Sequence, residues 1–418
     1  MVLGLVSKSE ATDDRDKIYG ILGFAGLDAK SDSSHLKIVV DYTLPVETLY
    51  TTTTVSMAKS DMNLRVLGIV GYSAYRKYRS LPSWCPDYSV GNIRLGEEYH
   101  FHGDLLCGRQ WKSHHPTIEH NAEQQTLTVD GFRYDTLDNV SVRVQYPDIN
   151  IAEMYGLAFG LLGMAASLQI HGHSRVECLW KLMLEDKFLL GTNDDVPGIL
   201  RLFFPYFLME AISNAVKSIK SAEPSSRPEQ IRRFVDDLTF SEKVIRALIR
   251  LEPESAILLP GPDTVMTIRE TLLREGGLDR VAEMLGTTSL LKDMLQRVRT
   301  AGLLNDDFSK VLGQGLQHDT DDSKVKRQLQ LYIAKVKTKI RNCVVGDLQY
   351  FTTSRLQLLG YGYERIDRDC EVWVLHGYPS PVLLRKKGGS MYEFCATAVV
   401  RGLWEPECGG EITRISLV

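Results

Sequence analysis

The densest set of side chains that could bind a metal ion lies in the polar segment around residues 97–120. Half of the ten histidines fall there: His100, His102, His114, His115 and His120. On a β-strand, His100 and His102 would point to the same face, which is the geometry that a metal ion needs from an H-x-H pair. Cys107, Glu97 or Glu119 could complete such a site. Exposed loop histidines explain the same pattern, so we expect no bound metal and no cofactor, with His100, His102, His114 and His115 as the alternative metal ligands.

A second group of ionisable residues forms the stretch "TDDRDK" at Thr12–Lys17. Asp13 can cap a helix, with Asp16 three residues later, because acidic groups favour the positive end of the helix dipole by about 0.3 to 1 kcal/mol. Arg15 can bind a carboxylate through two parallel hydrogen bonds and tie the helix to a neighbouring segment. A catalytic or binding use of Asp13, Arg15 and Asp16 is the alternative. A capped helix whose arginine ties it to a neighbouring segment is sufficient to explain these charges.

A stiff corner is predicted at "LPSWCPDYS", residues 81–89. Its prolines restrict the turn, Trp84 supplies a large apolar anchor, and Asp87 can accept hydrogen bonds from backbone amides. A Trp84 that stacks on a ligand is the alternative. Elsewhere the sequence has no G-x-S-x-G nucleophile motif and no G-x-x-x-x-G-K-[ST] phosphate loop, so we assign no catalytic residue.

Composition restricts the remaining function classes. The chain has 418 residues, of which 44 % are hydrophobic and 24 % charged, and its formal charge of -4 gives no reason to expect nucleic-acid binding. Its seven cysteines include no C-x-x-C pair, which indicates reduced thiols. The uncharged stretch 154–170 is short for a membrane span and is expected to be a core helix. The opening lacks the basic region of a secretory signal, so we expect a cytoplasmic protein without membrane contact.

Hydrophobic periodicity predicts four regions. Residues 1–80 form a helical junction, with one helix from about Asp13 and another after Pro45; residues 81–146 are rich in short strands and turns. Residues 147–342 form a helical body, with apolar sets at 151–170, 176–190, 198–220, 228–250 and 264–300. Residues 343–418 return to a period of two. The predicted fold class is α+β, a large helical body plus a small antiparallel sheet or barrel formed by pairing 81–146 with 343–418.

The order and spacing of three segments resemble fungal heterokaryon incompatibility (HET) domain proteins. "TDDRDKIYGILGFA", "VDYTLPVETLY" and "LPSWCPDYS" match the family's T-D-x-R-D-K, D-Y-S and L-P-S-W-x-P-D-W-S segments. The matching positions are Thr12, Asp13, Arg15, Asp16, Lys17, Tyr19, Leu22 and Gly23, then Asp41, Tyr42 and Tyr50, then Leu81 to Trp84 and Pro86 to Ser89. A weaker resemblance extends to "LTVDGFRYDTLDNVS" and to "VWVLHGYPSPVLLR" with Arg385. The signature positions are expected to be structural.

The resemblance also implies what is missing. In that family the HET domain precedes the T-D-x-R-D-K segment, and its two opening motifs do not occur here, so the sequence looks like a truncated form. HET domains are thought to be related to TIR-like folds, which places any nucleotide chemistry mainly in the missing part. The expected function is therefore a non-enzymatic scaffold or regulatory region in fungal self/non-self recognition and programmed cell death, acting on a protein partner. The alternative is a nucleotide-binding or nucleotide-hydrolysing enzyme with a site around Asp13, Arg15, Asp16 and Asp87.

Overall fold

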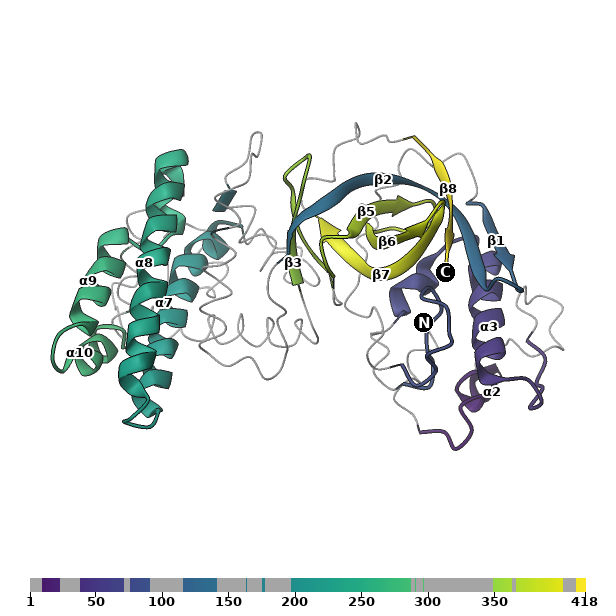
Figure 1. The fold of residues 1–418 in the computed structure, drawn as a ribbon, viewed down its shortest axis with the longest axis horizontal. Helices are drawn as coiled ribbons and strands as arrows, with labels where there is room; N and C mark the ends of the chain where they lie inside the picture. The colour runs from purple at the N-terminus through teal and green to yellow at the C-terminus, as the bar shows by residue number, and fades with distance from the viewer. Residues whose placement is uncertain are drawn as a thin grey trace, which may run out of the picture. The chain divides into compact units, whose positions relative to one another are not determined.

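The structure is a computed structural model. It describes residues 10–22, 38–70, 76–90, 116–140, 197–286, 349–362, 366–400 and 411–418, with the single positions 163, 175, 176, 290 and 296. The chain divides into two compact units, one of residues 1–140 with 347–418 and one of residues 141–346 (Figure 1). The candidate metal ligands His100, His102, His114 and His115 lie outside the described residues, as does most of the uncharged stretch 154–170.

The second unit, within its described part, is helical. Its elements are α7 (Pro197–Ser221), α8 (Arg227–Leu251), the short 3-10 helix η5 (Pro253–Leu258), α9 (Pro262–Leu272) and α10 (Gly277–Met284). The predicted helices 198–220 and 228–250 are confirmed by α7 and α8. The apolar set that begins at residue 264 is split into α9 and α10 by a turn at residues 273–276, in which Gly276, directly before α10, adopts a left-handed conformation (φ 65°).

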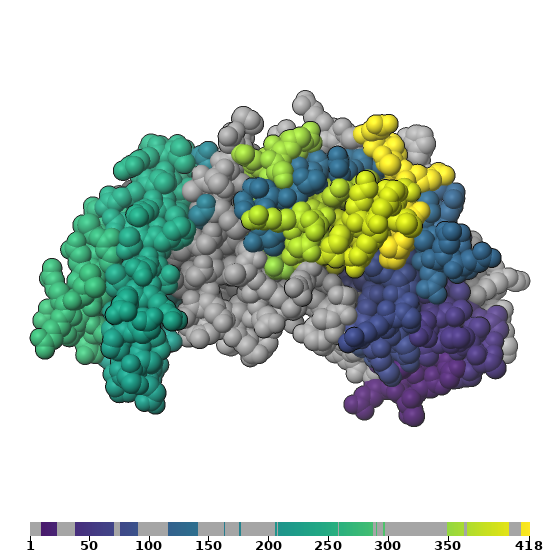
Figure 2. Space-filling model, viewed as in Figure 1, coloured from purple at the N-terminus to yellow at the C-terminus, as the bar shows by residue number. Residues whose placement is uncertain are grey.

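Two helices open the first unit. The first, α2 (Asp16–Leu22), begins later than expected and buries Ile18, Ile21 and Leu22. The second, α3 (Val46–Ser60), follows Pro45 and buries a stripe that includes Leu49, Tyr50 and Val55, which confirms the predicted helix after this proline. A 3-10 helix, η1 (Arg65–Ile69), completes the layer. Figure 2 shows these N-terminal segments, in purple and dark blue, lying directly against the strands.

The strands of the first unit form one eight-stranded sheet. They are β1 (Ile118–Asn121), β2 (Thr126–Val140), β3 (Gln349–Thr353), β4 (Leu359–Gly362), β5 (Cys370–Leu375), β6 (Val382–Gly388), β7 (Met391–Val400) and β8 (Thr413–Leu417). The strand order is β1-β2-β3-β4-β7-β6-β5, and β5 pairs again with β2, so the sheet closes on itself. All pairs are antiparallel except β7 with β8.

Closure gives the sheet two buried faces. Along β5, Cys370, Val372 and Val374 belong to an inner core with Phe132 and Phe351. Trp373 and Leu375 of the same strand belong to an outer core, which packs the sheet against the helical layer. Other members of this core include Trp84, Tyr50, Leu417 and Leu49. Every residue of β5 is therefore buried, although its side chains alternate between two cores.

The second unit is an insertion between two paired strands of the first. Leu137 of β2 pairs with Thr353 of β3, and Val140 pairs with Phe351, so the chain leaves and re-enters the sheet at neighbouring positions. The buried carboxylate of Asp135 strengthens this junction by accepting hydrogen bonds from the backbone N–H groups of Thr136 (2.8 Å), Arg355 (3.2 Å) and Leu356 (2.9 Å).

The predicted fold class is wrong in its proportions. Of the described residues, 43 % are helical and 25 % lie in strands, with six α-helices and the eight-stranded sheet. Two of these helices, α2 and α3, cover the sheet rather than adding to a helical body. The expected small β unit is instead a closed sheet built around the 15-residue strand β2, which the sequence presented as several short strands. Strands from residues 118–140 and 349–417 share this sheet.

No helix in the described ranges combines the length and the apolar composition that crossing a membrane requires.

Replacing residues 141–346 by an Asn-Gly linker is expected to leave the first unit folded. Because Val140 pairs with Phe351, the linker and residues 347–350 form a short loop between paired positions, and a shorter loop loses less entropy on closure. Thermal unfolding followed by Trp fluorescence should show a cooperative transition. A control deletion that also removes β3 and β4 should abolish it. Loss of cooperativity in the first variant alone would contradict the insertion topology.

Candidate functional site

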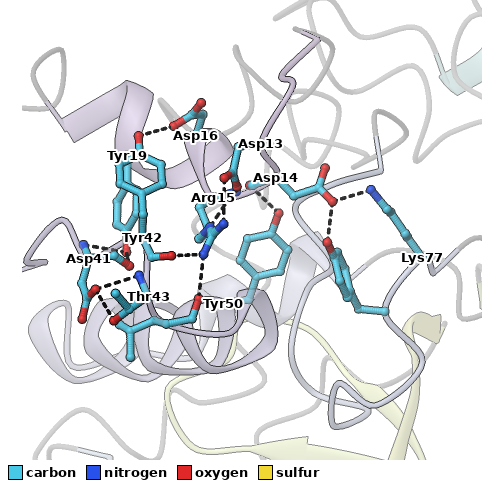
Figure 3. A network of polar contacts seen from close by, with 12 residues as sticks. Asp13, Asp14, Arg15, Asp16, Tyr19, Asp41, Tyr42, Thr43, Tyr50 and Lys77 are labelled. Carbon is cyan, nitrogen blue, oxygen red and sulfur yellow. Dashed lines mark hydrogen bonds and ion pairs between the residues drawn. The ribbon is translucent and has the colours of Figure 1, made fainter.

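The signature segments meet in one set of contacts, which we call the N-terminal network and which Figure 3 shows from close by. Its described members are Asp13, Asp14, Arg15, Asp16, Tyr19, Asp41, Tyr42, Tyr50, Lys77, Tyr78 and Asp87. Three parts of the chain supply them: α2 with the residues before it, α3 with the loop before it, and residues 76–89.

Arg15 lies at the centre of the first two parts. Its Nε and Nη2 donate to the two carboxylate oxygens of Asp13 at 2.9 and 2.8 Å, a bidentate pair. Its Nη1 donates to the backbone carbonyls of Tyr42 and, at 3.1 Å, Leu44. The guanidinium also lies 5.5 Å from the centre of the Tyr42 ring. The Arg15 side chain thus ties the start of α2 to the loop before α3, as we expected. The carboxylate that it binds belongs to Asp13, two residues earlier in the same segment.

Two tyrosines add bonds between the same segments. The Tyr19 hydroxyl donates to the carbonyl of Asp41 at 2.9 Å and accepts from the amide of Asp41 at 3.1 Å. The Tyr42 hydroxyl donates to the carboxylate of Asp16, and the two rings meet edge to face at 5.2 Å. The carboxylate of Asp41 closes the loop by accepting from the amide and hydroxyl of Thr43. The residues of the "TDDRDK" and "DYT" segments therefore bond mainly to each other.

Asp14 connects this set to the third part of the chain. One oxygen of its carboxylate accepts from the Lys77 ammonium and from the Tyr78 hydroxyl, and its carbonyl accepts from the Tyr50 hydroxyl at 2.8 Å. Burial opposes ionisation of Asp14, but the bonds from Lys77 and Tyr78 outweigh it and hold the pKa of this carboxyl below its ordinary value of 3.8.

Asp87 holds the corner itself. Its carboxylate is 2 % exposed and accepts from the amides of Lys77 (2.8 Å), Tyr78 (2.9 Å) and Ser89 (3.0 Å) and from the Ser89 hydroxyl (2.6 Å). Arg76 acts on the same corner from the other side, because its guanidinium donates to the carbonyls of Leu81, Pro82, Ser83 and Cys85. Two charged side chains thus bind the backbone carbonyls and amides of this irregular segment.

The corner also docks onto the sheet. Trp84 is fully buried, and its indole N–H donates to the carbonyl of Gln125 at 3.2 Å. The Ser83 amide donates to the carbonyl of Val418, and the Phe394 amide donates to the Ser83 hydroxyl. Behind it, burial raises the pKa of the Cys85 thiol to about 11. Cys85 is therefore a protonated packing residue here, not a nucleophile.

The contacts of the N-terminal network hold its segments together. Asp13, Arg15, Asp16 and Asp87, the residues of the alternative enzyme hypothesis, lie in one region, and each binds groups of this chain. Asp87 is separated from solvent, whereas Asp13 is partly exposed. The structure contains, in the part it describes, no group of three His, Cys, Asp or Glu side chains placed to bind a metal ion.

Sequence reasoning missed Asp14, Arg76, Lys77 and Tyr78. Asp14 stands between two residues of the signature, and its partner Lys77 lies 63 positions away. Arg76 donates to four backbone carbonyls. Every residue type has a backbone carbonyl, so the side chains at those positions do not indicate the role of Arg76. The cluster "RKYR" before the corner was the one available signal, since it placed three basic residues beside an acidic turn.

The substitution Asp87→Asn is expected to lower the free energy of unfolding by about 1 to 3 kcal/mol, because an amide has one acceptor oxygen for the amides that Asp87 now satisfies. Urea denaturation followed by circular dichroism measures the change. The exposed Asp61→Asn on the end of α3 is the matched control and should change stability little. Equal effects of the two substitutions would contradict a holding role for Asp87.

The contribution of Asp14 to stability should depend on pH. Its pKa in the folded chain is below 3.8, so its bonds stabilise the fold at neutral pH, and this stabilisation is lost as the pH falls through the folded pKa. The stability gap between the native chain and Asp14→Asn should therefore shrink below about pH 4. Denaturation curves at neutral and acidic pH test this, and a gap that widens on acidification would refute it.

Comparison with protein-family models, with curated proteins and with solved structures finds no match to this chain. The resemblance to heterokaryon incompatibility proteins therefore rests on the three motifs and their spacing.

Proposed function

We propose that this chain is a scaffold or regulatory region of a heterokaryon-incompatibility-type protein of fungal self/non-self recognition. It acts in the cytoplasm through contacts with a protein partner and performs no catalysis of its own. The proposal rests on the motif resemblance and on one observation above all: the signature residues bond to one another. Arg15 joins Asp13 to the carbonyl of Tyr42, the Tyr42 hydroxyl donates to Asp16, and the Tyr19 hydroxyl donates to the carbonyl of Asp41.

The engagement of these groups also weighs against the enzyme alternative. A general acid or base must exchange protons with a substrate, and a nucleotide phosphate needs free donors. Here the bonds of the Arg15 guanidinium run to a neighbouring carboxylate and two carbonyls, and the Asp16 carboxylate accepts from Tyr42. Use of either group in catalysis would require breaking contacts that fasten α2. Three free thiols, Cys85, Cys370 and Cys395, suit a reducing compartment.

Two experiments test the proposal. Pure full-length protein incubated with NAD and related nucleotides should give no turnover by chromatography. Turnover that is abolished by Arg15→Ala and by Asp16→Ala, with the fold retained by circular dichroism, would overturn it.

The second experiment measures recognition. A fungal strain expressing the chain should form less vigorous heterokaryons with a tester strain than does an otherwise identical strain expressing Asp87→Ala, in which the corner is loosened. The exposed Asp61→Ala is the matched control and should behave like the native chain. Heterokaryons that grow equally with the native chain and with an empty vector would contradict the recognition role.

A further inference from the structure

Strand β8 occupies a position between two other strands of the sheet. Its five residues pair with residues 127–131 of β2 in the antiparallel direction, and Ser416 and Leu417 pair in parallel with the first two residues of β7. Figure 1 shows β8 beside the start of β7. The side chains of Ile415 and Leu417 are 1 % and 0 % exposed and belong to the outer core. β8 is therefore an added strand whose apolar side chains complete this core.

Polar side chains fix the register of β8 on β2. The hydroxyls of Thr128 and Ser416 lie 3.1 Å apart. The Arg414 guanidinium donates to the Asp130 carboxylate at 3.1 Å and lies 3.7 Å from the Glu119 carboxylate of β1. A shift by one residue would separate these groups and turn the buried side chains of β8 to the other face of the sheet. The position between β2 and β7 is therefore specific for this strand.

The end of β8 also holds the corner at residues 81–89. The Ser83 amide donates to the Val418 carbonyl at 2.9 Å, and the Ser83 hydroxyl donates to the same oxygen. The Phe394 amide donates to the Ser83 hydroxyl at 2.8 Å, and the Val418 amide donates to the Tyr392 carbonyl at 2.9 Å. Whichever chain supplies β8 therefore also completes the corner.

The connection that leads to β8 is short for the distance that it covers. β7 and β8 form the one parallel pair of the described sheet, and residues 401–412 join them. A parallel pair needs a crossover of about a dozen residues or more, so this connection is at the lower limit. It must return along β7, which rises about 30 Å over its 10 residues.

A flexible connection of this length favours a shorter distance between its ends. It contains Gly402, Gly409 and Gly410, and a flexible Gly-rich chain of this length has a root-mean-square extent of about 20 Å. Reaching the position between β2 and β7 of its own chain therefore requires stretching, which lowers the effective concentration of β8 at that position. A second copy of the chain offers the same contacts without this constraint.

We propose that β8 is exchanged between two copies of this chain, so that the β8 of each copy lies between β2 and β7 of the other. Every contact of β8 described above is kept in the exchanged form, because the two copies are identical. Only the path of residues 401–412 differs, since it no longer has to run back along β7 of its own chain. The product is a closed dimer with two-fold symmetry, in which each copy completes the corner of the other. This contact between copies is separate from the protein partner proposed above.

The first experiment detects the exchange by disulfide trapping in the full chain. Thr128 lies directly opposite Ser416 of β8 and directly opposite Glu119 of β1. Thr128→Cys is co-expressed with a differently tagged Ser416→Cys or, as the matched control, with a tagged Glu119→Cys, and the purified proteins are oxidised. The first mixture should form a disulfide between positions 128 and 416 of different chains, identified by nonreducing electrophoresis and peptide mass spectrometry. The control should form none between chains, because the turn at residues 122–125 keeps β1 with β2 of its own chain.

The second experiment measures the role of the connection. Gel filtration with light scattering should show a dimer of the native chain, and inserting about eight Gly and Ser residues after Gly409 should raise its dissociation constant about tenfold or more. The same insertion after Glu223, between α7 and α8, is the matched control and should leave the dissociation constant unchanged.

A chain that stays monomeric at every concentration overturns the proposal. A dimer in which positions 128 and 416 of different chains form no disulfide also overturns it, because the copies then meet through another surface. An insertion after Gly409 that leaves the dissociation constant unchanged overturns the role of the connection.

Discussion

The pairing requirement of strand β2 is the constraint on which the first unit depends. A buried strand of 15 residues presents backbone donors and acceptors along both edges, and each must find a partner. No single strand meets this need here. Strands β1 and β8 pair with the first part of β2 along its two edges, β5 pairs with the middle, and β3 pairs with the end. Shifts in register near residues 133–135 and 137–139 let β2 change partners and bend. Closure of the sheet follows from this bend.

Irregular segments meet the same requirement with charged side chains. Arg76 satisfies four carbonyls of the corner at residues 81–85, Asp87 satisfies the amides of residues 77, 78 and 89, and Asp135 does the same at the β3–β4 turn. A guanidinium donates several hydrogen bonds in fixed directions, and a carboxylate accepts several. These groups therefore replace the ladder bonds of regular structure where the chain must turn. The corner becomes rigid enough to seat Trp84 against the sheet.

The N-terminal network uses charge in the same way. Its acids and bases hold three segments of the chain together, and Arg15 alone binds one carboxylate and two carbonyls. A smaller cluster in the sheet repeats this arrangement, because Arg385 of β6 binds the carboxylates of Asp367 at 2.6 Å and Glu393 at 2.8 Å. In both places the charged groups join separate parts of the chain to one another.

The sequence by itself determined the local periods. Apolar spacing located α7, α8 and the helix after Pro45, and alternation identified strand character in residues 126–140 and 370–400. It also singled out Asp13, Arg15 and Asp87 and expected them to be structural. The spacing of apolar residues indicates which face of a helix or strand is buried. It does not indicate which other element packs against that face.

The tertiary structure alone decided the partners. It made β2 one long strand rather than several short ones, closed the sheet, and inserted the helical unit between Val140 and Gln349 of paired strands. It also brought Asp14 to Lys77 and Trp84 to Gln125. Such contacts join residues far apart in the chain, and each depends on the packing of everything between them, so no local pattern of residue types encodes them.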